Sequence, residues 1–151
     1  MMKVLSHYFF ATIIVILFCS FSFADSANLP TAKVQVGGNV FSLLVAKTSA
    51  QQQKGLGGYK TIPQDGMIFI FARPQTLVFY MKDMLFPIDI IWIANNKVVG
   101  FSLNVPVEKN VAVKDLKLYY SPALCDTVIE LAAGSVKKLN IKAGDIVKTG
   151  L

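Results

Sequence analysis

Histidine and cysteine are scarce in this sequence, and their scarcity excludes several kinds of catalytic site. Among 151 residues there is one histidine, His7, and there are two cysteines, Cys19 and Cys125. Nucleophilic catalysis by serine or cysteine commonly uses a histidine base, and many zinc sites are built from His and Cys. Since His7 and Cys19 lie in a segment that we expect to be removed, the remaining chain lacks the side chains for either kind of site.

Arginine and acidic residues are also few. The chain has 15 basic and 9 acidic residues, a formal net charge of +6, and its one arginine is Arg73. The lysines are scattered, and only Lys137 and Lys138 are adjacent. A nucleic-acid site would cluster its cations and interleave aromatic residues. The pattern therefore favours a solvated basic surface, weakly attracted to anionic surfaces, and no nucleic-acid partner.

The N-terminal segment is typical of a secretory signal peptide. Lys3 is followed by an apolar run from Tyr8 to Phe23, and Ser22-Phe23-Ala24 forms a small-x-small exit before Asp25. We expect residues 1–24 to be removed and the protein to be exported, to the periplasm or the extracellular space.

Two other interpretations of this segment stay open. It could remain as an uncleaved membrane anchor, which would be the chain's one membrane contact, although the run is at the short end for a bilayer span. The second interpretation is a lipoprotein signal, because Cys19 lies near the right place. Such a signal needs a small residue before its cysteine, and here Phe18 precedes Cys19.

The rest of the chain is expected to be a mobile leader, residues 25–31, and one domain, residues 32–151. No internal repeat or low-complexity segment interrupts that domain. A domain of this size buries roughly two-thirds of its unfolded surface, so it needs no metal or disulfide in order to fold. Cys125 is expected to be buried and inert.

Apolar runs with a period of two predict a mainly β (α+β) fold, a single compact antiparallel β-barrel or sandwich with two short helices. One helix is expected after Thr48 or Ser49, ended by Gly55 in the left-handed conformation, and the other after Gly134. Hairpin turns are expected at Gly37-Gly38 and Asn95-Asn96. The predicted strands cover residues 33–36, 40–46, 67–71, 76–82, 88–93, 97–103 and 126–133, with a last strand in 142–148.

The most hydrophobic stretch, Tyr80–Ile93, reads "YMKDMLFPIDIIWI" and carries three charges. Proline has no amide donor for a sheet, so we expect two core strands joined by a turn at Leu85–Pro87. In the second strand, alternation places Asp89, Ile91 and Ile93 on one face and Ile88, Ile90 and Trp92 on the other. The segment "ARPQ", which contains Arg73, is expected to be a turn. Arg73 is either exposed there or a clamp for a carboxylate.

The order of several motifs resembles the domain of unknown function 192 family, an uncharacterised ancient conserved region. The resemblance rests on "KGLGG", "DGMIFIF", "FYMKDMLFPIDIIWI", "KVVG" and "VIELAAGSVKKLNIKAGD", and covers about Val40 to Val147. It implies a small β-rich domain, often exported, with no established activity.

Lys82, Asp89 and Glu130 are charges set within apolar strands. A buried isolated charge is costly, so each should be paired or reach water. One interpretation is a structural ion pair of Lys82 with Asp89 or Glu130. The other is a ligand-binding pocket, whose mouth these three residues form with Asp65, Tyr80 and Asp83.

The sequence is compatible with three hypotheses about function. The favoured one is a non-enzymatic binding module of the cell envelope, for a small ligand or a protein. An alternative is an envelope hydrolase or lyase that uses Asp83 and Asp89 with Lys82. The third is a structural accessory of a larger envelope protein. No catalytic residue, cofactor or metal ligand is assigned. Tyr119 and Tyr120, in a long irregular loop, either bind a sugar or a partner protein, or pack the loop onto the barrel.

Overall fold

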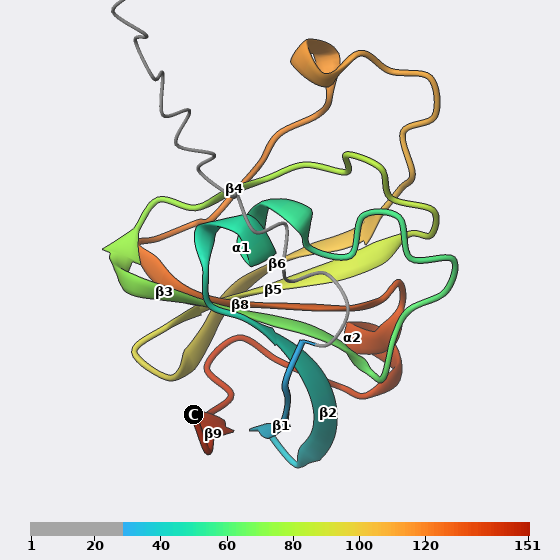
Figure 1. Cartoon of the computed structure of the whole chain (residues 1–151). Helices are drawn as coiled ribbons and strands as arrows, with labels where there is room; N and C mark the ends of the chain where they lie inside the picture. Colours follow the sequence, from blue (N-terminus) through green and yellow to red (C-terminus); the bar gives the residue numbers. More distant parts are fainter. Residues whose placement is uncertain (1–28) are drawn as a thin grey trace, which may run out of the picture.

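The computed structural model describes residues 29–151 of the chain (Figure 1). The expected signal segment, residues 1–24, and residues 25–28 of the expected leader lie outside this part. Leu29 packs against the hydrophobic core, and the Pro30 carbonyl accepts a hydrogen bond from the Val45 amide at 2.8 Å. No helix within residues 29–151 is long and apolar enough to cross a membrane.

The described chain is mainly β-structure with two short α-helices. The strands are β1 (Thr31–Val36), β2 (Asn39–Ala46), β3 (Gly66–Gln75), β4 (Val78–Phe79), β5 (Ile88–Ala94), β6 (Lys97–Val105), β7 (Tyr119–Tyr120), β8 (Cys125–Ala132) and β9 (Val147–Thr149). The helices are α1 (Ser49–Lys54), α2 (Ser135–Lys138) and a 3-10 turn, η1 (Val113–Asp115). The expected hairpins at Gly37-Gly38 and Asn95-Asn96 are confirmed, and Gly37, Asn95 and Asn96 have the positive φ angles that tight turns require.

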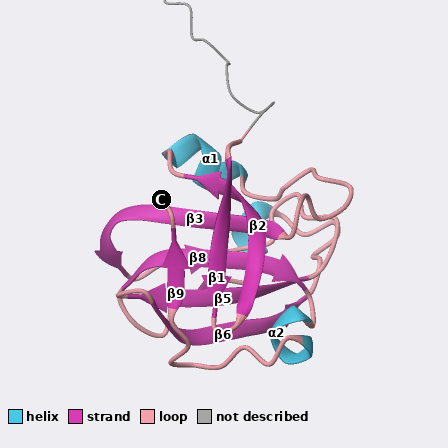
Figure 2. Cartoon of the chain, turned by 90° about the horizontal axis from the view of Figure 1, so that it is seen from below, coloured by secondary structure: helices cyan, strands magenta, loops and turns pink. Residues whose placement is uncertain are grey.

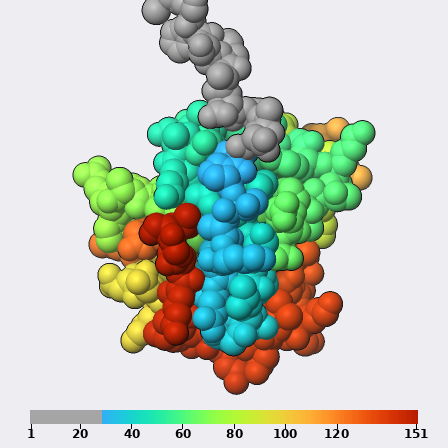
Figure 3. Space-filling model, turned by 60° about the horizontal axis from the view of Figure 1, so that its bottom comes forward, coloured from blue at the N-terminus to red at the C-terminus, as the bar shows by residue number. Residues whose placement is uncertain are grey.

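Seven strands form one curled sheet in the order β6-β5-β8-β3-β2-β1-β9, and β4 and β7 form a separate pair. All pairs are antiparallel except β2 with β3. Seen from below, β1, β2 and β9 run across β3, β8, β5 and β6 (Figure 2). On the surface β9 lies beside β1 (Figure 3). The sheet does not close, because the two ends meet only near the isolated bridge between Lys97 and Ile146. The predicted barrel or sandwich is therefore corrected to a curled half-barrel.

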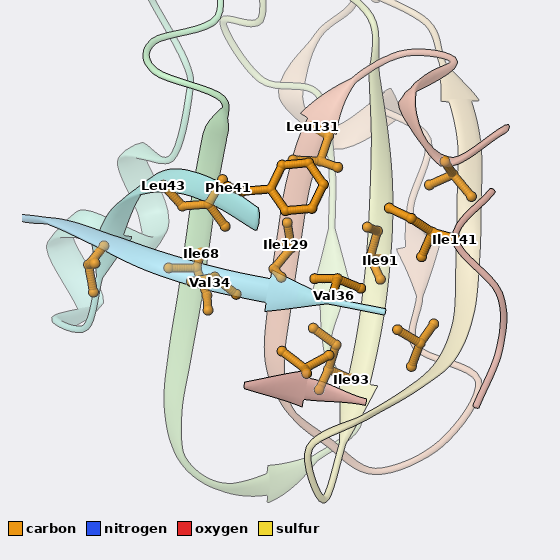
Figure 4. Packing of buried hydrophobic residues seen from close by; sticks show 14 residues of the cluster. Val34, Val36, Phe41, Leu43, Ile68, Ile91, Ile93, Ile129, Leu131 and Ile141 are labelled. Carbon is orange, nitrogen blue, oxygen red and sulfur yellow. The ribbon is translucent and has the colours of Figure 1, made fainter. Parts of the chain in front are cut away.

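The main sheet carries a hydrophobic cluster on each face. On the concave face, Val34 and Val36 of β1 face Ile91 and Ile129 across the interior (Figure 4). On the other face, β5 contributes Ile88, Ile90 and Trp92 to a second cluster. The predicted alternation of these apolar β5 residues is confirmed. Burial of both clusters supplies the main driving force for folding, at roughly 25 cal/mol per Å² of apolar area.

The predicted strand over residues 76–82 is largely wrong. Only Val78–Phe79 is a strand, and it pairs with Tyr119–Tyr120 rather than with the main sheet. The expected turn at Leu85–Pro87 is displaced toward the N-terminus, because Asp83 takes a φ of 58° and the Met84 amide donates to the Met81 carbonyl. Partners from the distant loop decide where this segment is extended, and local alternation does not reveal them.

The predicted turn at "ARPQ" is also wrong. β3 continues through Ala72–Gln75, with an irregularity in its pairing to β8 between Ile70 and Gln75. Gln75 pairs with Cys125, which keeps the segment extended although its side chains are exposed. Arg73 is exposed on this strand.

Candidate functional site

Helix α1 lies over one face of the main sheet (Figure 1). A pocket of about 330 Å³ lies on this face, between α1, β3, β4 and β8. Pockets that bind small molecules have volumes of about 300–1,000 Å³, so the space is near the lower end of that range. It combines an apolar interior with a few polar side chains, as ligand pockets do.

Helix α1 forms one wall of the pocket. The helix is short, and side-chain hydrogen bonds hold it in place. The Thr48 hydroxyl accepts a hydrogen bond from the Gln51 amide at 3.3 Å, and the Gln51 side chain accepts one from the Thr48 amide at 3.0 Å. This is a capping box. Gln52 Nε2 also donates to the Ile70 carbonyl of β3 at 2.7 Å. The helix ends at Gly55 with φ 48° and ψ −138°, so the left-handed conformation expected there is not the one observed.

Aromatic side chains form the interior of the pocket. Phe69 and Phe79 line it and stack edge to face, with ring centroids 5.0 Å apart. Phe79 makes a second such contact with the buried Trp92 at 5.5 Å. Edge-to-face pairs of this kind stabilise by about 0.5–1.5 kcal/mol beyond their buried area. The interior is therefore aromatic and lies next to the chain's only tryptophan.

Glu130 is the acidic side chain of the pocket lining, and it is 6% exposed. Its position on β8 is set by cross-strand pairing with Met67 of β3 and Ile90 of β5. Its Oε2 atom is buried and has no hydrogen-bond partner. Burial raises the pKa of the Glu130 carboxyl from 4.5 to about 8, so the group is mainly neutral at pH 7. A neutral carboxyl can both donate and accept a hydrogen bond.

Polar side chains surround the mouth of the pocket. Lys54 comes from the last turn of α1, and Tyr80 and Lys82 follow β4; all three are exposed. Two cationic side chains therefore stand at the entrance to an apolar space.

The predicted ion pair of Lys82 with Asp89 or Glu130 is wrong. Lys82 makes no contact within 4.0 Å with either carboxylate, and the ion pair found among residues 29–151 joins Lys114 to Asp115. Lys82 reaches water instead, so it needs no acidic partner.

Asp89 is satisfied by backbone amides. It is 1% exposed, and its Oδ1 and Oδ2 accept hydrogen bonds from the Asn104 amide at 2.8 Å and the Val136 amide at 3.0 Å. Val136 lies in the first turn of α2, so Asp89 joins β5 to β6 and to that helix. Charge-assisted hydrogen bonds of this kind are roughly twice as strong as neutral ones.

The six predicted site residues therefore divide into two groups. Tyr80, Lys82 and Glu130 line the pocket, and Asp65, Asp83 and Asp89 do not. Asp65 accepts a hydrogen bond from the Ser42 amide at 2.7 Å at an exposed turn. The Asp83 side chain is exposed, and its carbonyl accepts the Gly58 amide at 2.8 Å.

Several lining residues were not predicted as site residues. They are Ser49, Gln52, Gln53 and Lys54 from α1, Leu56 after it, Phe69 and Phe71 of β3, and Val78, Phe79 and Met84 around β4. The alternation in "GMIFIF" already places Phe69 and Phe71 on one face. The sequence pattern does not reveal the parallel pairing of β2 with β3, which places α1 beside these rings.

Two other polar groups are buried away from the pocket. Cys125 is fully buried, as expected, and burial raises the pKa of its thiol. The Tyr119 hydroxyl is buried without a hydrogen-bond partner, and burial with the nearby Glu108 raises its pKa. No group of three or more His, Cys, Asp or Glu side chains suited to a metal ion occurs in residues 29–151.

Comparison with known proteins finds a family model and two similar structures. The model of DUF192, described as "Uncharacterized ACR", matches residues 32–149. A protein of unknown function from Novosphingobium aromaticivorans DSM 12444 is 27% identical, with a TM-score of 0.72 over 83% of this chain and 89% of its own. A proposed transcription regulator from Sinorhizobium meliloti 1021 is 23% identical, with a TM-score of 0.70 over 83% of this chain and 98% of its own. Among curated proteins, no match is found.

Proposed function

Because this chain belongs to the DUF192 family, whose members are described as uncharacterised, its function has to be argued from its own pocket, and we propose that it is a non-enzymatic small-molecule-binding protein of the cell envelope. The ligand is held beneath α1, against the aromatic side chains of β3 and β4. The N-terminal signal pattern supports the envelope location.

The observation that carries the proposal is the buried carboxyl oxygen of Glu130 that has no hydrogen-bond partner. An unsatisfied buried polar atom costs about 1–3 kcal/mol, and folded proteins rarely keep one without a reason. The Oε2 atom of Glu130 is such an atom, and the residue lines a pocket that opens to solvent. A ligand that hydrogen-bonds to this carboxyl would offset the cost, which makes Glu130 the polar anchor of the site.

Binding is favoured over catalysis because of what surrounds this anchor. Hydrolysis with acid and base needs two groups placed across the reacting bond. The lining holds one carboxyl, Glu130, while Asp83 and Asp89 lie outside it. The lysines also lack the clustering of a nucleic-acid surface, so the regulator described from Sinorhizobium meliloti does not lead us to propose DNA binding here.

The binding test uses phenylnaphthylamine, a neutral fluorescent aromatic probe. Trp92 contacts Phe79, so probe bound in the pocket should accept energy from this single tryptophan. We expect saturable binding of one probe per chain. Val78→Phe, which adds a ring at the lining, should weaken binding severalfold, and Val40→Phe on β2 is the matched control. Absence of saturable binding, or equal effects of both substitutions, would refute the proposed pocket.

The envelope location has its own test. When the full-length chain is expressed, a processed protein whose first residue is Asp25 should be recovered from the periplasmic or extracellular fraction. Recovery of the intact chain from the cytoplasmic fraction would contradict export.

A further inference from the structure

The pocket has an uneven distribution of charge. At its mouth stand the exposed cations Lys54 and Lys82, from two separate segments of the chain. In its interior stands the single acid of the lining, Glu130, and burial raises the pKa of this carboxyl to about 8. At neutral pH the lining is therefore cationic at the entrance and mainly neutral at its base.

The interior between these polar ends is apolar. Phe69 and Leu56 are 1% exposed, and Met84 is 7% exposed. Phe71 and Phe79 add two more rings. A ligand that fills this space needs an aromatic or aliphatic body to replace water favourably, because each buried CH₂ contributes about 0.8 kcal/mol.

We infer, on the basis of the proposed binding function, that the ligand is a small organic monoanion with an apolar body. Its anionic group lies at the mouth beside Lys54 and Lys82, its body lies against the rings of Phe69 and Phe79, and the neutral Glu130 carboxyl hydrogen-bonds to a polar atom at its inner end. Aryl and short acyl carboxylates or sulfonates have this chemistry.

Two other ligand classes fit the site less well. An organic cation would pass two lysines and meet a carboxyl that is mainly neutral. A phosphate ester would need free backbone N–H groups, such as a glycine-rich loop can provide. Residues 55–58 form a glycine-rich loop at the pocket, but three of its amides already have partners. Gly55 donates to the Gln51 carbonyl, Gly57 to that of Lys54 and Gly58 to that of Asp83.

The inferred ligand also couples binding to a proton. The titratable groups of the lining besides Glu130 are Lys54 from α1 and Tyr80 and Lys82 from the segment after β4. The flanking strands present Met67 and Ile90 opposite Glu130, which do not titrate. Ionisation of Glu130 places a negative charge at the base of the pocket, so an anionic ligand should bind the protonated form better.

The test compares two probes that share one ring system. Anilinonaphthalene sulfonate carries a single negative charge, and phenylnaphthylamine carries none. We expect the sulfonate to bind about tenfold more tightly at pH ~7, as measured by energy transfer from Trp92. Equal affinities would overturn the inferred anion preference. If binding of the neutral probe still depends on Val78, the proposed binding function survives that result; if neither probe binds, the proposed function itself fails.

Matched lysine variants locate the charge effect. Lys54→Gln with Lys82→Gln should remove most of the preference for the sulfonate over the neutral probe. Lys33→Gln with Lys148→Gln, on β1 and β9 outside the lining, removes the same net charge and should have no effect. Equal losses in both double variants would show general attraction to a basic protein and overturn the site. Near-UV circular dichroism verifies that each variant is folded.

The pH dependence of sulfonate binding tests the role of Glu130. Sulfonate affinity should decrease about tenfold between pH ~7 and ~9, because the unprotonated fraction of Glu130 increases over this range. Glu130→Gln stays neutral and should make affinity independent of pH. A wild-type affinity that does not change with pH would overturn the role given to this carboxyl.

Both free organic acids and anionic lipids carry such an anionic group. Competition with the bound sulfonate distinguishes these two classes of ligand. Benzoate or octanoate in solution should displace the bound sulfonate. Displacement by phosphatidylglycerol vesicles but by neither dissolved acid would overturn the assignment to a small free anion.

Discussion

Asp89 and Glu130 lie on neighbouring strands and face opposite sides of the sheet. Asp89 pairs with Leu131, and Glu130 pairs with Ile90, so the two carboxyls are one position out of step along β5 and β8. Asp89 accepts hydrogen bonds from two backbone amides. The Oε2 atom of Glu130 has no partner. Two acids of similar burial therefore differ in environment: backbone amides satisfy Asp89, and Glu130 keeps an unpaired oxygen at the pocket.

Asp89→Asn should destabilise the fold without affecting probe binding. An amide in place of the carboxylate keeps one acceptor, and its NH₂ group then faces the Val136 or Asn104 amide. The expected loss is about 1–3 kcal/mol of unfolding free energy, measured by urea denaturation. Asp83→Asn, at an exposed turn that tolerates asparagine, is the control and should change stability by less than about 0.5 kcal/mol. Loss of probe binding in folded Asp89→Asn would assign this residue to the site after all.

Glu130 should make the protein less stable as pH increases. Between pH 4.5, the ordinary pKa, and about 8, the folded state retains a proton that the unfolded state has released. The stabilisation is thus complete below about pH 4.5 and is lost as pH rises toward 8, with a slope of at most about 1.4 kcal/mol per unit.

Urea denaturation at a series of pH values measures this slope. Glu130→Gln should abolish it, and Glu108→Gln, in the loop after β6, should leave it unchanged. An identical slope in wild type and Glu130→Gln would refute the raised pKa.

Gly66→Ala should be strongly destabilising. Gly66 has a φ of 141°, and an added Cβ would lie 2.0 Å from the Glu130 carbonyl oxygen, a backbone atom that cannot rotate away. Strain and the displaced strand together should cost about 3 kcal/mol or more. Gly38→Ala, where an added Cβ meets no atom within 4 Å, is the matched control. Similar thermal midpoints for both variants would contradict this close contact of β3 with β8.

Thr48→Ala should loosen α1 more than the rest of the protein. The helix has six residues and none is buried, so its caps contribute much of its stability. Loss of the capping hydroxyl should cost about 1 kcal/mol. Hydrogen exchange of amides 49–54 should accelerate, while exchange in β8 should not change. Thr61→Ala, in the exposed loop after the helix, provides the comparison. Uniform acceleration throughout the chain would mean that α1 does not open independently.

Local patterns in the sequence were sufficient for the elements whose partners are close in the chain. Asn95-Asn96 fixed one hairpin, and the alternation of Ile91 with Trp92 assigned the faces of β5. The pocket depended on pairings between distant segments instead. The register of β5 with β8 decides that Glu130, and not Asp89, faces the pocket. The pairing of Val78 with Tyr120 shortens the strand that was predicted up to Lys82.

The two faces of the main sheet carry separate hydrophobic clusters, and only one of these clusters borders the pocket. The concave cluster, which includes Ile91 and Ile129, secures the fold without contributing to the pocket lining. Phe71 and Val78 lie on the other side, where a change alters the shape of the pocket before it alters the sheet. Substitutions around α1 can therefore change the pocket while the cluster that holds the sheet together stays the same, so chains with this fold need not share a pocket.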